Sequence, residues 1–561
     1  MLEIAARLTV AETSRTLSYA KTTDFRPPLP PGLHPRTGKP FEPFPFQCAG
    51  VEYALQRKDT LIGDSPGLGK SIEGILLFNA DTTVKRVLVI CPASLKENWR
   101  REFNLWKTRP VSVGIAETKY REQFADGFYK NGKPRTKTIV HDEWWPDCAV
   151  VIINYDILGR FSKEISAVKW DLLICDEAHA LKTDDSGRTL FVLGGRKRDK
   201  VKGRWETTWF NAVNADRRLF LTGTPMMNRP IELWPMCKAF DPEGLGRDKV
   251  DFGYRYCDGY FDPSRGPTGD YNFTGASNLP ELGQALRAKF MIRRLKKDVL
   301  PELPAKWRQV VILDSPEIRA LVAREDELAQ ALKLYEDILR PAESEADREA
   351  RIAAEIIANA SRLGFDEASD PDKPRSRALN LDYAAAVLGL EPSAVEVAFQ
   401  EMAIVRRELG LAKLSAAIPW IKNFLDGGEK LLVFGYHTDV LKGAYEALAK
   451  YDPILIYGGV HPNKRQPLVD RFQDDEACRV GLLQTDAGGV GYTLTRAKDI
   501  CFLEGDWSPT KQEQNFDRIC RIGQTAEKLM GFHLVANGSL DAKIAGRALE
   551  KEGQISEAMD T

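Results

Sequence analysis

Short apolar segments recur along this chain at a spacing that favours parallel β-sheets. Between residues 46 and 240, runs rich in Val, Ile and Leu alternate with polar stretches of helical character; the runs are RVLVICP, CAVVIINY, WDLLICDE and RRLFLTGTP. Continuous apolar runs of this length are typical of strands buried on both faces and joined by helices. The pattern resumes after residue 425 with EKLLVFGYH, DPILIYGG, CRVGLLQTD, AKDICFLEG and LMGFHLVA. The sequence therefore predicts an α/β protein with two parallel-sheet units.

The segment between the two units has a different pattern. Residues 316–363 show helical periodicity without a strand signal, and a second helical stretch runs to about residue 425. We therefore expect five parts, namely a proline-rich N-terminal extension over 1–43, a first unit over 44–300, a linker with a helical protrusion over 301–425, a second unit over 426–540 and a tail over 541–561.

Composition excludes several classes of protein. The formal net charge is −1, so a nucleic-acid surface would have to be local. The nine cysteines form no C-x-x-C pair, which argues against a zinc site and favours small buried side chains in a reducing compartment. The chain begins without a secretory signal and contains no apolar run of membrane-spanning length, so we expect an intracellular protein with no membrane partner.

The stretch GDSPGLGKS, residues 63–71, indicates a phosphate-binding loop before a helix. Gly67 and Gly69 let the backbone curl around phosphate oxygens, Lys70 would reach the β- and γ-phosphates, and Ser71 would hold Mg²⁺. The generic pattern has glycine where Asp64 stands, and the competing interpretation is a glycine turn before a helix. The predicted ATP-binding residues of the loop are Asp64, Ser65, Pro66, Gly67, Leu68, Gly69, Lys70 and Ser71.

Two further motifs follow apolar runs of the first unit. In LLICDEAHAL, Asp176 is predicted to bind Mg²⁺ and Glu177 to orient or deprotonate water, unless the pair is a solvated acidic turn. In LFLTGTPMMN, Thr222 and Thr224 are candidates for sensing the phosphate site, although a simple turn is the alternative.

The second unit carries QEQNFDRICRIGQ, in which Gln514, Arg518 and Arg521 fit one helical face. Arginines so placed usually make surface ion pairs. Opposite a triphosphate, however, an arginine neutralises transition-state charge. The sequence therefore predicts these three residues as part of the catalytic set.

These four elements, in this order, resemble superfamily-two helicases, and in detail the Swi/Snf-type DNA-translocating ATPases. That family's loop typically reads D-E-M-G-L-G-K-T, so Asp64 matches it, whereas Ser65-Pro66 and Cys520 replace its usual Glu-Met and histidine. The resemblance extends over residues 44–540. It implies two RecA-like lobes with a helical insertion, ATP and Mg²⁺ as cofactors, and adenine recognition by Gln47 in FPFQCAGVEY.

The resemblance also implies where DNA binds. The segment VICPASLKENWRREF matches one that carries Pro92, Ser94, Asn98 and Trp99 beside the DNA backbone. The full set of expected DNA contacts is Ser94, Asn98, Thr222, Thr485, Gly488, Gly489 and Trp507. Two basic stretches, 130–137 and 195–204, are additional candidates, the second as an insertion near the working edge of the first lobe. Solvated surface loops are the alternative for both.

The function implied is an ATP-dependent double-stranded-DNA translocase. The segment from RYCD to RRLKKDVLPELPAK is similar to the annealing-helicase branch, whose members rewind DNA and remodel forks, so duplex or branched DNA is the expected partner and a monomer the expected state. Alternatives are a strand-separating helicase, for which the sequence offers no obvious wedge, and the motor subunit of a larger DNA defence or transcription-recycling complex. The intact motifs argue against an inactive binding module.

Overall fold

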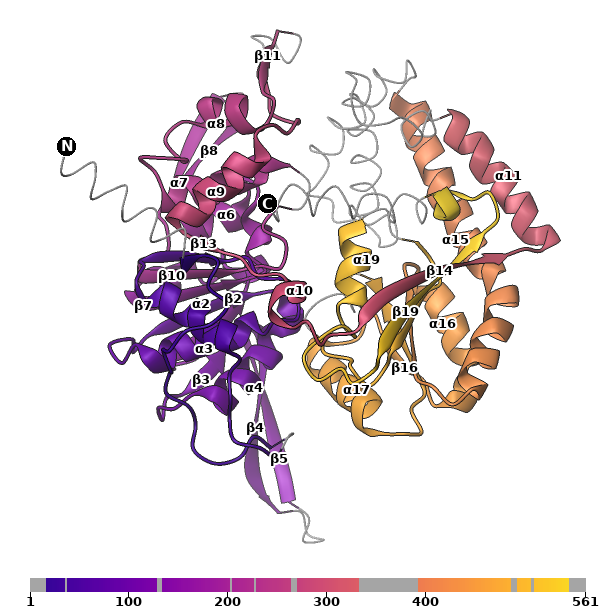
Figure 1. Cartoon of the computed structure of the whole chain (residues 1–561), viewed down its shortest axis with the longest axis horizontal. Coiled ribbons are helices and arrows are strands. Elements are labelled where there is room, and N and C mark those ends of the chain that lie inside the picture. The colour runs from indigo at the N-terminus through magenta and orange to yellow at the C-terminus, as the bar shows by residue number, and fades with distance from the viewer. Residues whose placement is uncertain are drawn as a thin grey trace. The chain divides into compact units, whose positions relative to one another are not determined.

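The computed structural model of the chain divides into two compact units, the first through Glu302 and the second from Leu303. Each unit is described by itself (Figure 1). The structure describes residues 17–35, 38–128, 134–201, 204–226, 229–263, 270–331, 392–485, 492–505 and 509–543.

A seven-stranded sheet, parallel throughout, forms the centre of the first unit. In spatial order its strands are β13 (Met291–Ile292), β1 (Asp59–Ile62), β10 (Ala215–Leu221), β7 (Trp170–Asp176), β2 (Val87–Cys91), β6 (Val150–Asn154) and β3 (Val113–Ile115). The four runs read as buried strands in the sequence are β2, β6, β7 and β10, so the prediction of a parallel sheet is confirmed.

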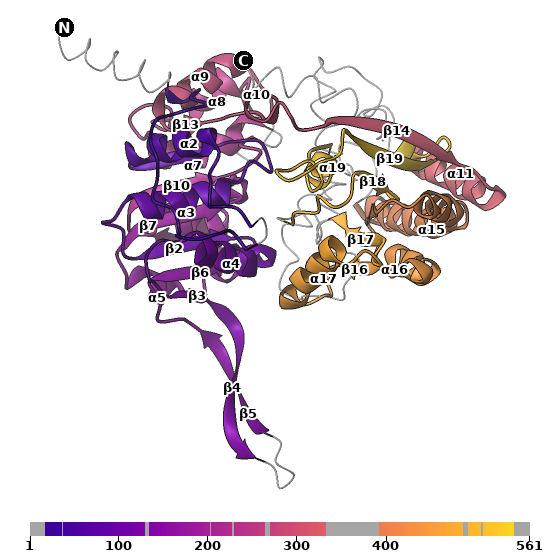
Figure 2. The same ribbon diagram turned by 60° about the horizontal axis from the view of Figure 1, so that its bottom comes forward.

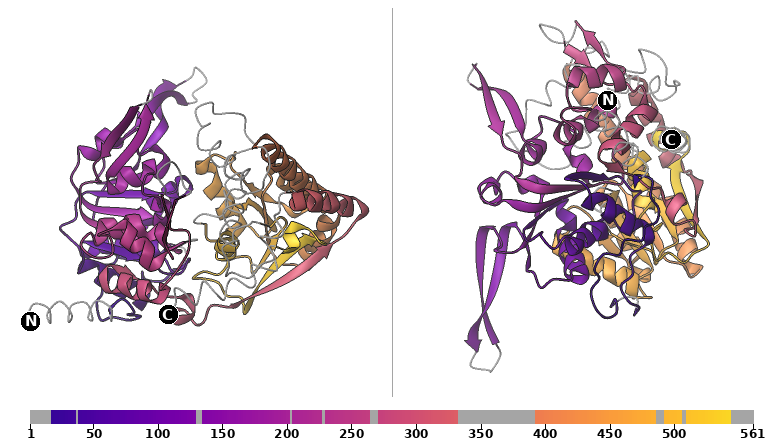
Figure 3. Two further views of the ribbon diagram at one scale, coloured as in Figure 1. Left: turned by 90° about the horizontal axis from the view of Figure 1, so that it is seen from above. Right: turned by 60° about the vertical axis from the view of Figure 1, so that its left-hand side comes forward.

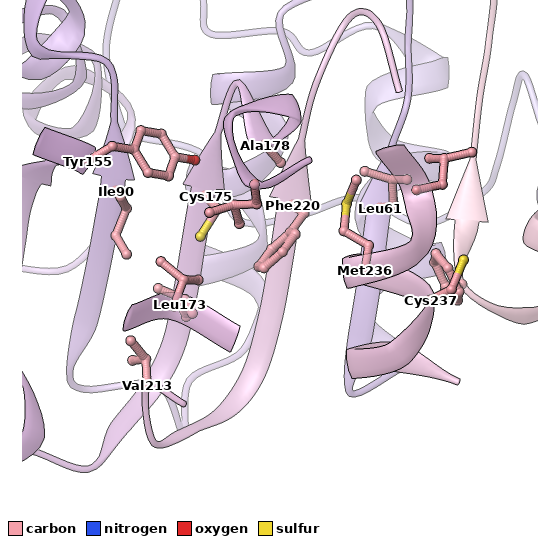
Figure 4. Packing of buried hydrophobic residues seen from close by; sticks show 14 of the residues in the cluster. Leu61, Ile90, Tyr155, Leu173, Cys175, Ala178, Val213, Phe220, Met236 and Cys237 are labelled. Carbon is pink, nitrogen blue, oxygen red and sulfur yellow. The ribbon is translucent and has the colours of Figure 1, made fainter. Parts of the chain in front are cut away.

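Alternate residues of these strands pack on opposite faces of the sheet, as the period of two requires. On one face, side chains such as Ile90, Leu173 and Phe220 join a fully buried cluster with residues of the helices that follow β7 and β10 (Figure 4). On the other face, Gly74 lies close to Ile174 and Leu219. Burial on both faces explains the continuous apolar runs of β2 and β6, of the centre of β7 and of the carboxyl half of β10.

Nine α-helices belong to the first unit within the described residues: α2 (Pro45–Leu55), α3 (Lys70–Ala80), α4 (Lys96–Trp106), α5 (Ser162–Ser166), α6 (Gly187–Leu193), α7 (Trp234–Phe240), α8 (Lys249–Tyr256), α9 (Leu279–Lys289) and α10 (Lys296–Val299). The proline-rich segment before α2 lies against them. The ring of Phe41 packs on Trp106 with centroids 5.0 Å apart, and Asn79 Nδ2 donates to the Pro28 carbonyl over 3.2 Å.

Three antiparallel hairpins are added to this unit. They are β4 (Glu117–Phe128) with β5 (Pro134–Trp144), β8 (Gly195–Val201) with β9 (Arg204–Phe210), and the short β11 (Tyr260–Asp262) with β12 (Asp270–Asn272). The first extends far from the sheet (Figure 2), and the second also stands away from the body of its unit (Figure 3). The two basic stretches thus fall on hairpins, although residues 129–133 and 202–203 lie outside the described residues.

The position of the second hairpin corrects one expectation. It follows α6, with Val213 N donating to Val192 O over 3.1 Å, and leads directly into Ala215, the first residue of β10. Its base therefore adjoins the amino end of β10. The phosphate loop follows the carboxyl end of the neighbouring parallel strand, so the insertion does not leave the unit at that edge.

The second unit contains a six-stranded parallel sheet. Its spatial order is β14 (Ala305–Leu313), β19 (Lys528–Ala536), β18 (Asp499–Phe502), β15 (Leu431–Gly435), β17 (Val480–Gln484) and β16 (Ile454–Ile456). Five of these are the runs expected from the sequence. The sixth, β14, was expected to be linker. As an edge strand with Trp307 and Ile312 exposed, it lacks the buried run that marks the others.

Helices cover both faces of this sheet. Leu431 and Val433 pack in a cluster with α11 (Pro316–Ala331), α15 (Pro392–Asp426) and α16 (Thr438–Ala447). The alternate residues Leu432 and Phe434 pack in a second cluster with α17 (Pro462–Asp474) and Phe516 of α19 (Pro509–Phe516). Among the described residues, no helix combines the length and apolar character that a membrane span needs.

A buried ionic cluster joins α11, α15 and the C-terminal segment. Lys413 and Arg406 both bind Asp541, although the sequence placed that aspartate in a tail. Beside them, Glu325 is fully buried. Its Oε2 accepts from Leu540 N over 2.9 Å, and its Oε1 has no hydrogen-bond partner among the described residues. Burial, reinforced by Asp541, raises the pKa of Glu325 to about 7.

This cluster predicts a pH-dependent contribution to stability. The pKa of Glu325 in the folded protein lies above its ordinary value of 4.5, so folding favours the protonated carboxyl group. The contribution of Glu325 to the free energy of unfolding is therefore highest below about pH 4.5 and decreases as the pH rises towards 7. At about 1.4 kcal/mol per pKa unit the loss approaches ~3 kcal/mol. Glu325→Gln should therefore have a higher Tm than wild type at pH 8, with the difference vanishing near pH 4.5. Glu327→Gln, exposed on the same helix, is the control. Parallel pH profiles for wild type and Glu325→Gln would contradict this account.

Candidate active site

The phosphate loop connects β1 to α3 at the carboxyl edge of the first sheet. Gly67 and Gly69 have φ of 85° and 80°, the left-handed region that glycine occupies without a steric cost. Lys70 begins α3, and its Nζ donates to the Asp64 carbonyl over 2.8 Å and the Ser65 carbonyl over 3.3 Å. Burial lowers the pKa of Lys70, and the nearby carboxylates, Glu177 first, oppose that shift. The ammonium group is thus held at the loop by two backbone oxygens.

Asp64 has a different role from the one predicted. Its side chain is 0% exposed, and its Oδ1 accepts hydrogen bonds from Arg294 N over 2.9 Å and Arg294 Nε over 3.0 Å. Arg294 Nη2 also donates to Glu73 Oε1 of α3 over 2.8 Å. A carboxylate buried this deeply needs a paired cation, which Arg294 supplies. The Asp64 side chain is therefore an anchor of the loop in this structure, and contact of this residue with ATP stays a prediction.

The same cluster explains a glycine in α2. A Cβ at Gly50 would lie 2.7 Å from Arg294 Nη2 and 2.9 Å from Glu73 Oε2. No side chain fits there, so α2 can approach the Asp64–Arg294–Glu73 cluster only through glycine. The cluster therefore fixes α2, the loop and α3 against one another.

Gln47 is also engaged within the protein. It is 1% exposed, its Nε2 donates to the Leu68 carbonyl over 2.9 Å, and its Oε1 accepts from Phe44 N over 2.9 Å. Both ends of the amide are used to hold the loop against the start of α2. In this structure Gln47 positions the loop, and it does not present its amide to a base as the sequence predicted.

Ser65-Pro66, which departs from the family pattern, meets the turn that follows β10. A Cβ at Gly223 would lie 2.6 Å from Pro66 Cγ, and a Cβ at Gly63 would lie 2.9 Å from Pro225 Cγ. Each segment thus presents a proline to a glycine of the other. The close approach of these two turns gives Pro66 a packing role.

The acidic pair ends β7 at the same edge. Asp176 Oδ2 accepts from Trp99 Nε1 over 2.8 Å, Asp176 Oδ1 accepts from Glu177 N over 3.0 Å, and the Tyr155 hydroxyl donates to the Asp176 carbonyl over 2.8 Å. Burial and then Glu177 raise the pKa of Asp176 to about 6. Trp99 is fully buried, so it supports the carboxylate and cannot lie beside DNA as expected.

His179 connects this pair to β10. Glu177 has a φ of 50°, a strained value for a residue other than glycine. Its Oε2 lies 3.3 Å from His179 Nδ1, and the same nitrogen lies 3.1 Å from Thr222 Oγ1. Thr222 is fully buried and also accepts from Thr224 N over 3.2 Å. The buried Thr222 side chain does not support the predicted contact with DNA, which stays untested, whereas its contact with His179 connects β10 to the acidic pair.

The remaining candidates of the first unit lie on helices. Ser71 is half-buried on α3, Ser94 on the 3₁₀ helix Ala93–Leu95, and Asn98 on α4. Ser71 and Asp176 offer the hard oxygen donors that suit Mg²⁺, an ion that usually retains water and takes few protein ligands. Among the described residues there is no group of three or more His, Cys, Asp or Glu side chains that could hold a metal ion.

The arginine element of the second unit differs from the prediction. Gln514 is on α19, but this helix ends at Phe516, and Arg518 N bonds to Asn515 O over 3.1 Å in a tighter turn. The turn buries Ile519 and Cys520 together in the apolar cluster. The arginines therefore do not share a helical face with Gln514. Arg521 is held by the Asp517 carbonyl and by Thr493 Oγ1, at 2.9 and 3.2 Å.

Of the DNA contacts expected in this unit, only Thr485 is described. It is buried, and its hydroxyl donates to the Gly435 carbonyl over 3.2 Å, so it is not presented to a phosphate. Gly488, Gly489 and Trp507 lie outside the described residues.

The sequence analysis missed Arg294, Tyr155 and His179. Arg294 follows the apolar pair Met291-Ile292, and a buried strand leading into arginine is a signal that could have indicated a buried ion pair. Tyr155 directly follows a predicted strand. His179 lies within the acidic motif itself, but no sequence pattern relates it to Thr222.

Comparisons with known proteins identify two family domains in this chain. The SNF2-related domain model matches residues 46–322, and the helicase conserved C-terminal domain model matches residues 415–523. The chain is 29% identical over 533 residues to the SWI/SNF-related matrix-associated actin-dependent regulator of chromatin subfamily A-like protein 1 of Xenopus tropicalis, covering 92% of this chain and 46% of the relative. It is 29% identical over 525 residues to the human DNA annealing helicase and endonuclease ZRANB3, covering 91% and 40%.

The chain thus spans less than half the length of these curated relatives. Among solved structures, the Sulfolobus solfataricus SWI2/SNF2 ATPase core in complex with dsDNA matches at 20% identity and a TM-score of 0.34, covering 92% of this chain and 94% of that one. A TM-score this low supports no conclusion, and the fold assignment rests on the two sheets. The two domain models and the match along nine-tenths of the sequence establish that the chain belongs to the Swi/Snf-type, SNF2-related family of helicase-like ATPases.

Proposed function

We propose that this protein hydrolyses ATP to ADP and phosphate and uses the energy to move along double-stranded DNA. The observation that carries the proposal is the convergence of the phosphate loop, the acidic pair and the Thr222 turn at the carboxyl edge of one parallel sheet, the edge at which α/β proteins bind ligands. The family supports hydrolysis, and the names of its relatives support DNA as the partner, with the rewinding or remodelling of branched DNA as the finer activity.

The residues of the first unit take distinct roles in this proposal. Lys70 exchanges the two loop carbonyls for phosphate oxygens when ATP binds, because its Nζ already lies at the loop. Glu177 orients and deprotonates the attacking water, and its link through His179 to Thr222 couples that water to the phosphate site. Ser71 and Asp176 would hold Mg²⁺, which neutralises phosphate charge when bound.

We assign to Gln514, Arg518 and Arg521 of the second unit a role in the same hydrolysis, with the arginines neutralising charge that develops on the phosphates. Arg521 is the better test residue, because Arg518 is buried and its loss would disturb the core. For DNA, Ser94 and Asn98 remain candidates, since both are half-buried and follow the carboxyl end of β2. Gly488, Gly489 and Trp507 remain predictions from the sequence.

Hydrolysis should depend on DNA and on Lys70. We expect duplex or forked DNA to stimulate wild-type ATP hydrolysis at least about tenfold over the rate without DNA, and Lys70→Ala to abolish the stimulated rate because the phosphates lose their ammonium partner. The measurement is phosphate release with no DNA, single-stranded, duplex and forked DNA. Equal wild-type rates in all four conditions would refute the translocase proposal.

Asp64 should affect both stability and ATP binding. Asp64→Asn removes a carboxylate from buried Arg294, and breaking such a pair costs about 3 kcal/mol, so the Tm should fall. Because the loop loses its anchor, the KM for ATP should rise as well. Asp59→Asn is the matched control, since it breaks the part-buried pair between Asp59 of β1 and Arg218 of β10, away from the loop. That control should lower the Tm and leave the KM unchanged. If the KM for ATP is unchanged in Asp64→Asn as well, Asp64 contributes to stability and not to ATP binding.

Arg521→Ala should lower kcat without unfolding the second unit. An arginine that neutralises transition-state charge contributes about 10³-fold or more to the rate, whereas in this structure the Arg521 side chain lies at a turn, on the Asp517 carbonyl and Thr493 Oγ1. The KM for ATP and the Tm should change much less than kcat. Arg496→Ala, which removes an exposed arginine of the same unit, should retain wild-type kcat. A loss of less than about tenfold in Arg521→Ala would exclude the proposed role.

A further inference from the structure

The β8–β9 hairpin concentrates positive charge. Residues 195–210 include six Lys or Arg and two acidic residues, which leaves four positive charges in a chain whose net charge is −1. The two strands pair in continuous register from Gly195 opposite Phe210 to Val201 opposite Arg204. A basic strand pair of this kind is suited to an anionic partner.

One face of the hairpin combines this charge with an aromatic ring. Arg196 lies opposite Trp209 and Arg198 opposite Thr207, so these four residues share a face, because cross-strand partners and residues two apart point the same way. All four are exposed. Trp209 is 72% exposed, the largest fraction among the large apolar side chains that the structure identifies as exposed. We refer to these four residues as the Trp209 face.

The base of the hairpin is attached firmly, so the exposed ring is not needed to hold it. Phe210 packs edge-on against Phe191 of α6, with ring centroids 5.3 Å apart. Gly194 has a φ of 75°, and a Cβ there would lie 2.7 Å from Ala212 N. The segments that enter and leave the hairpin therefore lie close together at its base. A single exposed tryptophan is unremarkable on a protein surface, but here it stands directly opposite an arginine and diagonal to another.

We propose that the Trp209 face binds an unpaired DNA strand. An indole ring stacks on any base whose face is free, and arginines contact the phosphates or stack beside the ring. The bases of a duplex are stacked on one another, so they offer no face to Trp209. The side-chain set therefore favours single-stranded over double-stranded DNA. The identification of the strand as DNA rests on the proposed function.

The position of this face separates it from the ATP site. The hairpin adjoins the amino end of β10, whereas the phosphate loop and the acidic pair follow the carboxyl ends of β1 and β7. Seven residues of β10 span about 20 Å at roughly 3.3 Å per residue. Binding at the Trp209 face should therefore change affinity for DNA with unpaired segments and leave the hydrolysis step unaltered.

The test measures binding by the full chain without ATP. The probes are a labelled single-stranded oligodeoxythymidine of 20 nucleotides and a labelled blunt duplex of 20 base pairs. Binding of each is measured by fluorescence anisotropy at several salt concentrations. Trp209→Ala should weaken binding to the deoxythymidine strand about tenfold, and Trp209→Phe should retain most of the affinity because stacking needs only a ring. Arg196→Ala with Arg198→Ala should reduce the slope of log K against log salt by about 1.4, or about 0.7 for each lost phosphate contact.

Two controls and a parallel assay decide the result. Trp307→Ala removes another exposed tryptophan and Arg247→Ala another exposed arginine, and both should bind the strand as wild type does. Wild-type affinity in Trp209→Ala, or an unchanged salt slope in the double arginine variant, would overturn the proposal. Hydrolysis at saturating duplex should be unchanged in the hairpin variants. If wild type itself shows no DNA-stimulated hydrolysis, the proposed function fails, and the oligonucleotide measurements still decide on the hairpin.

Discussion

The geometry of the phosphate loop depends on the buried cluster of Asp64, Arg294 and Glu73. It joins the loop to a segment 230 residues later in the sequence. That segment holds the loop by its backbone too, because Gly63 N donates to Ile292 O over 2.8 Å and Ser65 N donates to Arg294 O over 3.0 Å. β13 itself pairs through only two residues, so the ion pair and these hydrogen bonds add to an attachment in which Met291 and Ile292 are buried. The first unit can therefore form its nucleotide loop only when residues 291–294 are in place.

This attachment also sets the electrostatics of the site. Arg294 contacts both Asp64 and Glu73, yet burial still raises the pKa of Glu73 well above its ordinary value. Lys70 lies near the same pair and near Asp176 and Glu177. These four acidic groups favour the charged ammonium and partly oppose burial, which still lowers the pKa of Lys70 overall. A loop with an internal carboxylate in place of the generic glycine is thus compatible with phosphate binding, because Arg294 shields that charge from the ligand. Pro66, packed on Gly223, limits the loop's movement from the other side.

The sequence predicted the parts of the fold whose pattern follows from burial on both faces. β2, β6, β7 and β10 were all recognisable as continuous apolar runs, and so were five strands of the second sheet. β14 and the hairpins were not, because edge and exposed strands carry mixed residues such as Trp307 beside Arg308. In the site, Lys70, Asp176 and Glu177 could be assigned from motifs. The roles of Asp64, Gln47 and Trp99 could not, since each depends on a partner that only the tertiary fold brings near. The turn after α19 was missed because a helical pattern of spacings does not exclude a tighter turn that buries Ile519 and Cys520 together.

The hairpin bears on the distinction between translocation and strand separation. The sequence offered no obvious wedge, and the exposed tryptophan on the basic β8–β9 hairpin has the chemistry that a wedge would need. Its position argues against that use. Ser94 and Asn98, the DNA-contact candidates, follow the carboxyl end of β2, whereas the hairpin adjoins the amino end of β10, and parallel strands keep these two edges apart. A wedge that separates strands has to lie close to the residues that contact the duplex. A surface at the opposite edge is instead suited to holding a strand that is already unpaired, which is the situation at a branch, and which favours a motor that acts on branched DNA over one that opens a duplex.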